Sequence, residues 1–192
     1  MRDQSLRGHV GNLEQQGEMI RFDTEVDPHE NLSALGWKTY DQLGKSSLFT
    51  NLKGFPGWTV CNQIVTDRKK WSIAIGVDES ELIPTLVDRI RGEVEPVMVD
   101  AADAPVKEVI LTGRDADLTK IPAMWTSEND PSPYIASGMA VIKDPETGIR
   151  NVSIHRQQIQ TPDQTGFLIC PRHALRIYQM YQERNEPMPA AM

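Results

Sequence analysis

Apolar residues in the first half of the chain recur at helical spacing in four stretches, which short β-like runs separate. Spacings of three and four positions predict helices at residues 6–16, 32–43, 68–75 and 79–90. Three of these helices are preceded by an N-cap residue: Ser5, Asp67 or Asp78. Three are followed by a glycine that can end the helix: Gly17, Gly44 or Gly92. The runs between them predict strands at residues 19–22, 47–51 and 58–65. This alternation predicts an α/β domain over residues 1–115.

After about residue 115 the helical periodicity gives way to alternating polar and apolar positions. Residues 134–143 and 149–159 alternate as half-buried strands on either side of the sequence DPETG at 144–148. Because that sequence is rich in turn-forming residues, the two strands are expected to pair as an antiparallel hairpin.

A third strand is predicted at residues 166–169, and a helix follows Pro171. The apolar side of this helix has helical spacing and consists of Ala174, Ile177, Tyr178 and Tyr181. Three strands and one helix cannot close a barrel. We therefore expect an α+β chain whose second domain, residues 116–192, is the beginning of a β-barrel. We also expect the sequence to be a segment of a longer polypeptide.

Composition narrows the classes of partner and the compartment. The formal net charge is −7 and the pI is about 5.1, which argues against a nucleic-acid backbone as the main partner. No apolar window reaches the length of a membrane span, and the first twenty residues lack the apolar core of a signal peptide. The two cysteines, Cys61 and Cys170, are far apart in no metal or redox motif, so reduced thiols and a cytoplasmic location are expected.

Residues 151–158 form an unusually polar strand. Strand parity places Asn151, Ser153, His155 and Gln157 on one side, and Val152, Ile154, Arg156 and Gln158 on the other. Such a strand cannot be buried on both faces. Two interpretations remain open from the residues alone: a strand with one solvated face, or a strand that lines a polar ligand cleft.

His173, beside Arg172, is expected in the first turn of the helix after Pro171. Free backbone N–H groups and the positive end of the helix dipole make such a turn a natural phosphate site. A cationic imidazole is disfavoured there, so His173 either ligates a metal in its neutral form or faces water. The other two histidines, His9 and His29, are expected on the solvated sides of helical patterns.

Several segments together resemble the UbiD family of prenylated-FMN-dependent decarboxylases. They are residues 117–122 (DLTKIP) with 134–138 (YIASG), residues 144–156 (DPETGIRNVSIHR), and His173 with residues 185–189 (NEPMP). Residues 31–57, which include KGFPG at 53–57, also resemble the amino-terminal domain of that family. Residues 34–40 are similar to phthaloyl-CoA-type decarboxylases. The order and spacing of the segments carry the resemblance, which covers nearly the whole chain.

The resemblance implies an FMN-binding split β-barrel and an enzyme that removes or adds carbon dioxide at an aromatic or α,β-unsaturated carbon. Prenylated FMN would supply the chemistry, and a divalent metal, usually manganese, would hold its phosphate, with potassium as a further ion. Asn151 and His173 match the metal ligands. Ser153, Ile154, His155 and Arg156 match the segment lining the cofactor, Arg156 matches the catalytic arginine, and Arg172 matches a position beside the metal histidine. The substrate would be a small carboxylic acid or an aryl-CoA thioester, and the enzyme a homo-oligomer.

Two expectations follow from this assignment, one about the geometry of the strand and one about the remaining site residues. Asn151 and Arg156 are five positions apart, so a regular strand would place them on opposite faces, about 16 Å apart. If both serve one cleft, a bulge or sharp twist must lie between Ser153 and Arg156. The resemblance also places the third metal ligand, a glutamate, and the acidic partners of Arg156 beyond Met192. The segment alone is therefore expected to be inactive.

Two other functions fit the same residues. An FMN-binding split-barrel oxidoreductase would also need a phosphate site near residues 151–173, but it would work with unmodified FMN. A non-catalytic subunit of a multimeric carboxylase would have the same fold without turnover.

Overall fold

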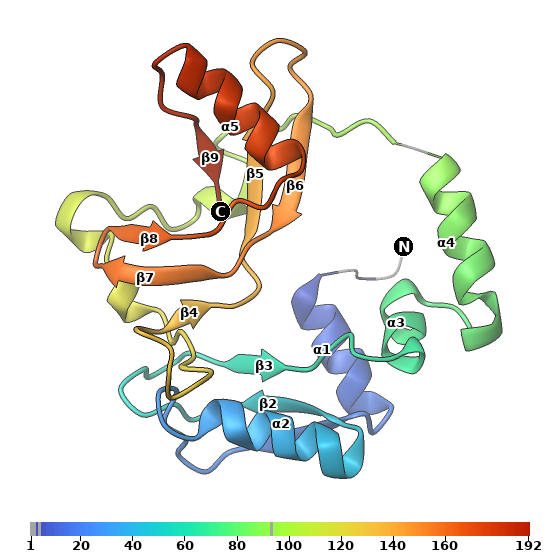
Figure 1. Cartoon of the computed structure of the whole chain (residues 1–192). Helices are drawn as coiled ribbons and strands as arrows, with labels where there is room; N and C mark the ends of the chain where they lie inside the picture. The colour runs from blue at the N-terminus through green and yellow to red at the C-terminus, as the bar shows by residue number, and fades with distance from the viewer. Residues whose placement is uncertain (1–2, 4, 93) are drawn as a thin grey trace. The chain divides into compact units, whose positions relative to one another are not determined.

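The computed structural model of the chain describes residue 3 and residues 5–92 and 94–192, and these form two compact units (Figure 1). The first unit contains the residues up to Asp27 and Asn31–Asp115, and the second contains Pro28–Glu30 and Ala116–Met192. No helix among the described residues combines the length and the apolar character needed to cross a lipid bilayer.

The first unit has the helices and strands that the sequence pattern predicts. In chain order they are α1 (Leu6–Gln15), β1 (Met19–Phe22), α2 (Leu32–Leu43), β2 (Ser46–Phe49), β3 (Val60–Asn62), α3 (Arg68–Ile75), the 3-10 helix η1 (Glu79–Glu81) and α4 (Leu82–Arg91). The hydroxyl of Ser5 accepts a hydrogen bond from the backbone N–H of Gly8 at 3.0 Å, and the carboxylate of Asp67 accepts one from Lys70 at 2.9 Å. Gly44 ends α2 with a φ of +65°, a conformation that favours glycine. Caps and stop signals therefore set most of these boundaries.

A three-stranded sheet in the order β1-β2-β3 forms the centre of this unit, with β1 and β2 parallel and β2 and β3 antiparallel. α1 packs against α3, and its buried residue Leu13 contributes to the core with Met19, Leu48 and Ile73. The rings of Phe22 and Phe49 stack with their centroids 4.9 Å apart. The core therefore joins the sheet to the two helices.

His9 differs from the expectation of a solvated histidine, because it lies on the buried side of α1 with 8% of its surface exposed. Its Nε2 atom is 2.8 Å from the carbonyl oxygen of Ile64, so Nε2–H donates this hydrogen bond. Nδ1 is buried without a partner among the described residues. The apolar spacing of Leu6, Val10 and Leu13 did not reveal that His9 lies on the same side of the helix.

Residues 94–115 contain little regular structure. They hold only two 3-10 helices, η2 (Pro105–Lys107) and η3 (Gly113–Asp115). The larger apolar side chains of this stretch are exposed, among them Val97, Met98, Val109 and Ile110.

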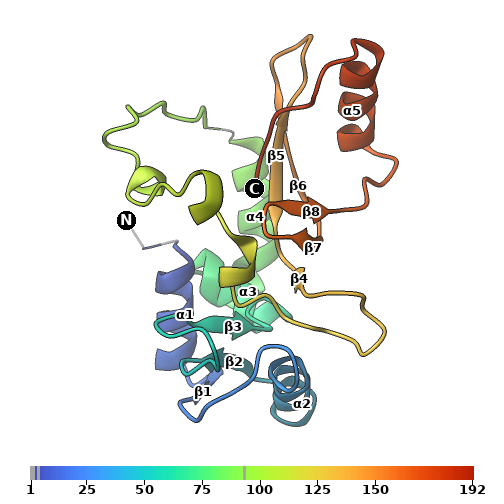
Figure 2. The same cartoon turned by 90° about the vertical axis from the view of Figure 1, so that its left-hand side faces the viewer.

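The second unit is built from short strands and one long helix (Figure 2). Its elements are the 3-10 helix η4 (Leu118–Lys120), β4 (Tyr134–Ile135), β5 (Met139–Lys143), β6 (Arg150–Ile154), β7 (Gln157–Thr161), β8 (Gln164–Gly166), α5 (His173–Glu183) and β9 (Ala190–Ala191). They make two separate sheets, in the orders β4-β7-β8 and β6-β5-β9. As expected, no closed barrel forms within the described residues.

Several boundaries in this unit differ from the sequence pattern. Each long predicted strand is divided, residues 134–143 into β4 and β5 and residues 149–159 into β6 and β7. The third strand ends at Gly166 instead of beginning there, and α5 begins at His173 rather than at Pro171. β9 was not predicted, since two alanines after a proline-rich turn carry no periodic signal.

α5 covers one side of the β5–β6 hairpin. Ala174 and Ile177 of the helix pack with Ile142 of β5, and Ile169, Tyr181 and Met188 surround them. The hydroxyl of Tyr181 donates a hydrogen bond to the carbonyl oxygen of Lys143 at 3.2 Å. These contacts fix the beginning of α5 close to β6.

Candidate functional site

The turn between β5 and β6 is held by the side chain of Asp144. Its Oδ1 atom accepts hydrogen bonds from the backbone N–H groups of Glu146 and Thr147, both at 2.9 Å. These N–H groups, Thr147 first and then Glu146, lower the pKa of the Asp144 carboxyl below its usual value. Gly148 has a φ of +76° and brings the chain back into β6. The turn therefore sets the register in which Ile142 lies opposite Asn151.

β6 has a polar face and an apolar face, as its parity predicts. Asn151, Ser153 and the following His155 are half-buried. Val152 and Ile154 lie on the other face with 60% and 70% of their surface exposed. In this strand the polar face is thus the more enclosed one. A strand with a solvated polar face, the simpler of the two interpretations, would show the opposite pattern.

Hydrogen bonds connect the three polar side chains in series. Nδ2 of Asn151 is 3.2 Å from Oγ of Ser153, and that Oγ is 2.8 Å from Nε2 of His155. Nδ1 of His155 is 3.2 Å from the carbonyl oxygen of Leu168, and the imidazole ring lies 5.2 Å from the ring of Phe167. The series runs from the middle of β6 to the segment that leads into α5.

Asn151 and His173 line the same hollow, although 22 positions of sequence separate them. The hollow lies between the β5–β6 hairpin and α5, and its walls are Asp144, Thr147, Ile149, Arg150, Asn151, His173, Arg176 and Ile177. His173 is the first residue of α5, so the free N–H groups of the helix start beside it. Arg176 follows one turn later, with its guanidinium 4.0 Å from the Asp144 carboxylate.

The chain changes sheets between Asn151 and Arg156, where a break in the strand was expected. β6 ends at Ile154 in one sheet, and β7 begins at Gln157 in the other (Figure 1). The N–H of His155 still donates to the carbonyl oxygen of Gly138 at 2.9 Å. Arg156 then turns away and places its guanidinium 5.0 Å from the centre of the Tyr134 ring. The expected break is confirmed, as a change of sheet and not as a bulge.

Glycine is needed at position 138, where the chain passes between β4 and β5. A Cβ atom there would lie 3.0 Å from Cδ of Gln157 and 3.3 Å from the carbonyl oxygen of His155. Gln157 is buried, so its side chain has little room to move. The two crossings, at residue 138 and at residues 155–156, therefore pack directly on each other.

The residues around the hollow suit an anionic ligand and part of a metal site. Arg150, Arg176 and the start of α5 offer positive charge and N–H donors, as a phosphate requires. Asn151 and His173 offer one amide oxygen and one imidazole nitrogen, which are ligands for a divalent transition metal. Asp144 is already engaged by two backbone N–H groups. No cluster of three or more histidine, cysteine or acidic side chains suited to a metal exists among the described residues. The hollow thus offers two side chains that could contribute to a larger set of metal ligands.

The structure separates the predicted site residues into groups. Asn151 and His173 share the hollow, and Ser153 and His155 reach it through hydrogen bonds. The side chain of Ile154 lies on the opposite face of β6, and Arg156 lies beyond the break. Arg172 is exposed and precedes α5 without lining the hollow.

Arg150, Arg176 and Asp144 were not among the predicted site residues. Arg176 had a usable signal, because it lies three positions after His173 on the helix and therefore projects to the same side.

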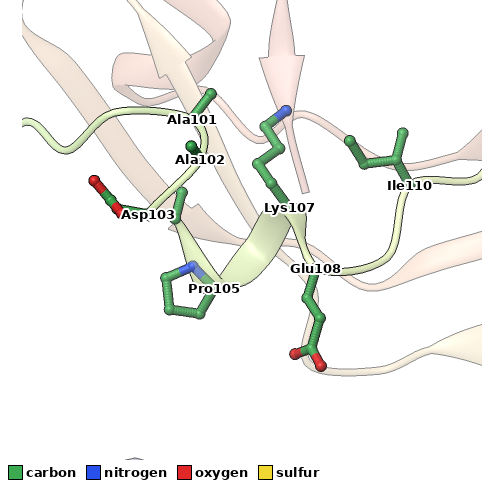
Figure 3. A pocket seen from close by; sticks show the side chains of 8 residues that line it. Ala101, Ala102, Asp103, Pro105, Lys107, Glu108 and Ile110 are labelled. Carbon is green, nitrogen blue, oxygen red and sulfur yellow. The ribbon is translucent and has the colours of Figure 1, made fainter.

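A second hollow lies in the first unit and is formed by a single stretch of chain, residues 101–110 (Figure 3). Lys107 and Glu108 point in opposite directions there, and the remaining labelled side chains are mainly small or apolar. No set of polar groups converges on a common point, so this hollow has no features of a chemical site.

Two families match the chain in succession. Residues 10–90 match the 3-octaprenyl-4-hydroxybenzoate carboxy-lyase N-terminal domain, and residues 97–192 match the 3-octaprenyl-4-hydroxybenzoate carboxy-lyase Rift-related domain, UbiD.

Known proteins show the same likeness. Anhydromevalonate phosphate decarboxylase of Methanosarcina mazei is 30% identical over 98% of this chain and 42% of its own length. Gallate decarboxylase of Lactiplantibacillus plantarum is 29% identical over 87% of this chain and 37% of its own length. An evolved dimeric form of the UbiD-class enzyme HmfF from Pelotomaculum thermopropionicum, solved in complex with prenylated FMN, superposes with a TM-score of 0.89 and 32% identity over 98% of this chain and 43% of that one.

The chain thus spans less than half the length of these relatives, and it matches the N-terminal domain and the Rift-related domain of the family in order. Together with the hairpin and helix that carry Asn151 and His173, these matches show that the chain belongs to the UbiD family of carboxy-lyases.

Proposed function

We propose that the chain forms the phosphate and metal end of a cofactor site in a prenylated-FMN-dependent decarboxylase. The observation that carries the proposal is the shared hollow of Asn151 and His173 at the start of α5. Family membership supports the cofactor, since the HmfF structure contains prenylated FMN. The substrate class we propose is an aromatic or α,β-unsaturated carboxylic acid, with aryl-CoA thioesters included.

Each residue has a distinct role in this proposal. Asn151 and His173 ligate a divalent metal, for which manganese is our choice, and the metal neutralises the flavin phosphate. Arg150 and Arg176 add positive charge beside that phosphate. Arg156 lies beyond the break, where its guanidinium can meet a substrate carboxylate at the reactive end. Prenylated FMN, when bound, supplies the electron sink for the charge left by departing carbon dioxide.

The arrangement of β6 accounts for how one short segment serves both ends of a long cofactor. The polar face of β6 addresses the phosphate, and the change of sheet after Ile154 redirects the chain before Arg156. Stacking on Tyr134 limits the rotamers of the Arg156 side chain, which holds the guanidinium in place before a substrate binds.

The metal assignment is tested in the whole protein with Asn151→Ala and His173→Ala. Both should lower bound manganese and bound flavin together, measured by elemental analysis and absorbance of the purified protein. Asn129→Ala and Gln179→Ala, on exposed positions, are the matched controls. Unchanged metal content in both Asn151→Ala and His173→Ala would show that the ligand assignment is wrong.

The catalytic role of Arg156 is tested separately. Arg156→Ala should abolish decarboxylation without loss of folding. Arg156→Lys should also have little activity, because lysine lacks the planar group that stacks on Tyr134.

Reconstitution with unmodified FMN distinguishes the two enzyme classes. An oxidoreductase would be active with it and a prenylated-FMN decarboxylase would not.

Assembly and a second ion also belong to the proposal. We expect the whole protein to form homo-oligomers and to use potassium beside manganese. Mass measurement of the native protein checks the first expectation and elemental analysis checks the second.

A further inference from the structure

The polar face of β6 contains a hydrogen-bond series whose direction is set by its far end. The carbonyl oxygen of Leu168 can only accept a hydrogen bond, so Nδ1 of His155 must donate to it. In the neutral imidazole the other nitrogen, Nε2, then carries no proton and must accept. The hydroxyl of Ser153, 2.8 Å away, therefore donates its single proton to Nε2.

The same logic continues to Asn151. Because the Ser153 proton is committed to His155, Oγ can offer only its lone pairs to Asn151. The Asn151 carboxamide must then present its N–H group to Ser153, as it does at 3.2 Å. This orientation leaves Oδ1 without a hydrogen-bond donor among the described residues. Amide oxygen and amide nitrogen differ completely as metal ligands, since only the oxygen has a lone pair to donate.

We infer that Ser153 and His155 are positioning residues that fix the orientation of the Asn151 carboxamide and so present Oδ1 to a cation in the hollow. This inference rests on the proposed metal role of Asn151. It assigns Ser153 and His155 an action through another side chain, and not direct contact with the cation.

Packing around His155 supports this action. The imidazole is half-buried, with its ring beside Phe167, and its backbone N–H is bound to Gly138. Ring and backbone are thus held from two directions, so the nitrogen atoms keep their places relative to Ser153. Outer hydrogen-bond partners of this kind typically change metal affinity about ten- to a hundredfold when they are removed.

Manganese binding to the whole protein, followed by electron paramagnetic resonance of the free ion without added flavin, tests the inference. Ser153→Ala should weaken binding about ten- to a hundredfold, and His155→Phe, which keeps an aromatic ring beside Phe167, should weaken it similarly. The double variant should bind manganese only slightly less tightly than the single variant of lower affinity, because both substitutions interrupt the same series of hydrogen bonds. Ser153→Thr keeps the hydroxyl and should bind as the unaltered protein does.

Val152→Ala is the matched control, since it alters the exposed face of the same strand and should leave affinity unchanged. If Asn151→Ala loses manganese while Ser153→Ala and His155→Phe bind it normally, the positioning role is wrong and the metal site stands. If Asn151→Ala also binds normally, the metal site itself is wrong.

The unaltered protein offers a second test that does not depend on variants folding. Nitrogen-15 chemical shifts of the His155 ring should show the proton on Nδ1. A proton on Nε2 in the neutral ring would reverse the series and overturn the inference.

Discussion

The ammonium group of Lys70 is fully buried in the first unit. It donates hydrogen bonds to the carbonyl oxygen of Gly44, at 2.6 Å, and to the Asp67 carboxylate, and it lies 5.3 Å from the centre of the Tyr40 ring. Lys70 therefore joins the end of α2 to the beginning of α3. Burial alone would raise the pKa of the Asp67 carboxyl, but hydrogen bonds from Lys70 outweigh it and lower that pKa.

Lys70→Met should lower the free energy of unfolding by about 2 kcal/mol or more, because the Gly44 carbonyl and Asp67 lose a buried partner. Lys69→Met removes an exposed lysine from the same helix and should have little effect. Urea unfolding of both variants measures the difference. Equal midpoints would show that the buried ammonium contributes nothing.

At the residue scale, strand parity was sufficient to place Asn151, Ser153 and His155 on one face. It could not show which face is enclosed, because that depends on α5, which begins 22 positions later in the chain. His9 shows the same limit: its side of α1 is buried by α3, and α3 is remote in sequence. Residue patterns predict periodicity, and tertiary contacts decide what each side meets.

The β5–β6 turn makes a pH-dependent prediction at the scale of the element. The pKa of Asp144 is lowered in the folded chain, so its contribution to stability is complete above the unfolded pKa, near 3.8, and is lost as pH falls through the folded pKa. Hydrogen exchange at the Glu146 and Thr147 amides should therefore accelerate, relative to its intrinsic rate, as pH falls below about 4. Asp144→Asn keeps an oxygen acceptor but cannot titrate, and should show no such step.

Gly138 makes a second prediction at this scale. Gly138→Ala should destabilise the second unit by roughly 1–3 kcal/mol, because the new methyl group overlaps the buried amide of Gln157. Gly11→Ala in α1 is the control: nothing lies within 4 Å of its Cβ position, and alanine favours a helix by about 1 kcal/mol. The midpoint temperature of thermal unfolding should fall for Gly138→Ala and rise for Gly11→Ala. A harmless Gly138→Ala would mean that the crossing is loosely packed.

Most elements could be predicted because caps, glycine stops and turn residues mark their ends. The long strands could not, since alternation continues through 134–143 and 149–159 although each changes sheet midway. At residue 138 a glycine marks the change. At residues 155–156 no residue pattern marks the change of sheet. A break was expected there only because the family resemblance places Asn151 and Arg156 in one cleft.

At the scale of the whole molecule, residues 94–115 follow α4 and contain no helix longer than three residues, although most of them lie within the second family match. Limited trypsin digestion should therefore cut first after Lys107 or Arg114, since both are exposed and an unsupported stretch fits a protease best. Lys107→Gln with Arg114→Gln should remove the early products in mass spectrometry. Early cleavage within α1 to α3 would contradict this.

The division of β6 and β7 between two sheets has a consequence for how the family can vary in length. A strand alternates its faces residue by residue, so deleting Val152 while the turn stays in place would move Ser153 to the outer face and turn Ile154 toward the hollow. Substitutions in this segment change one contact at a time, whereas a single insertion or deletion exchanges the two faces together. Length should therefore be kept from the DPETG turn to His155 in functional relatives, because the turn sets the register of Asn151 and its Asp144 and Thr147 line the hollow.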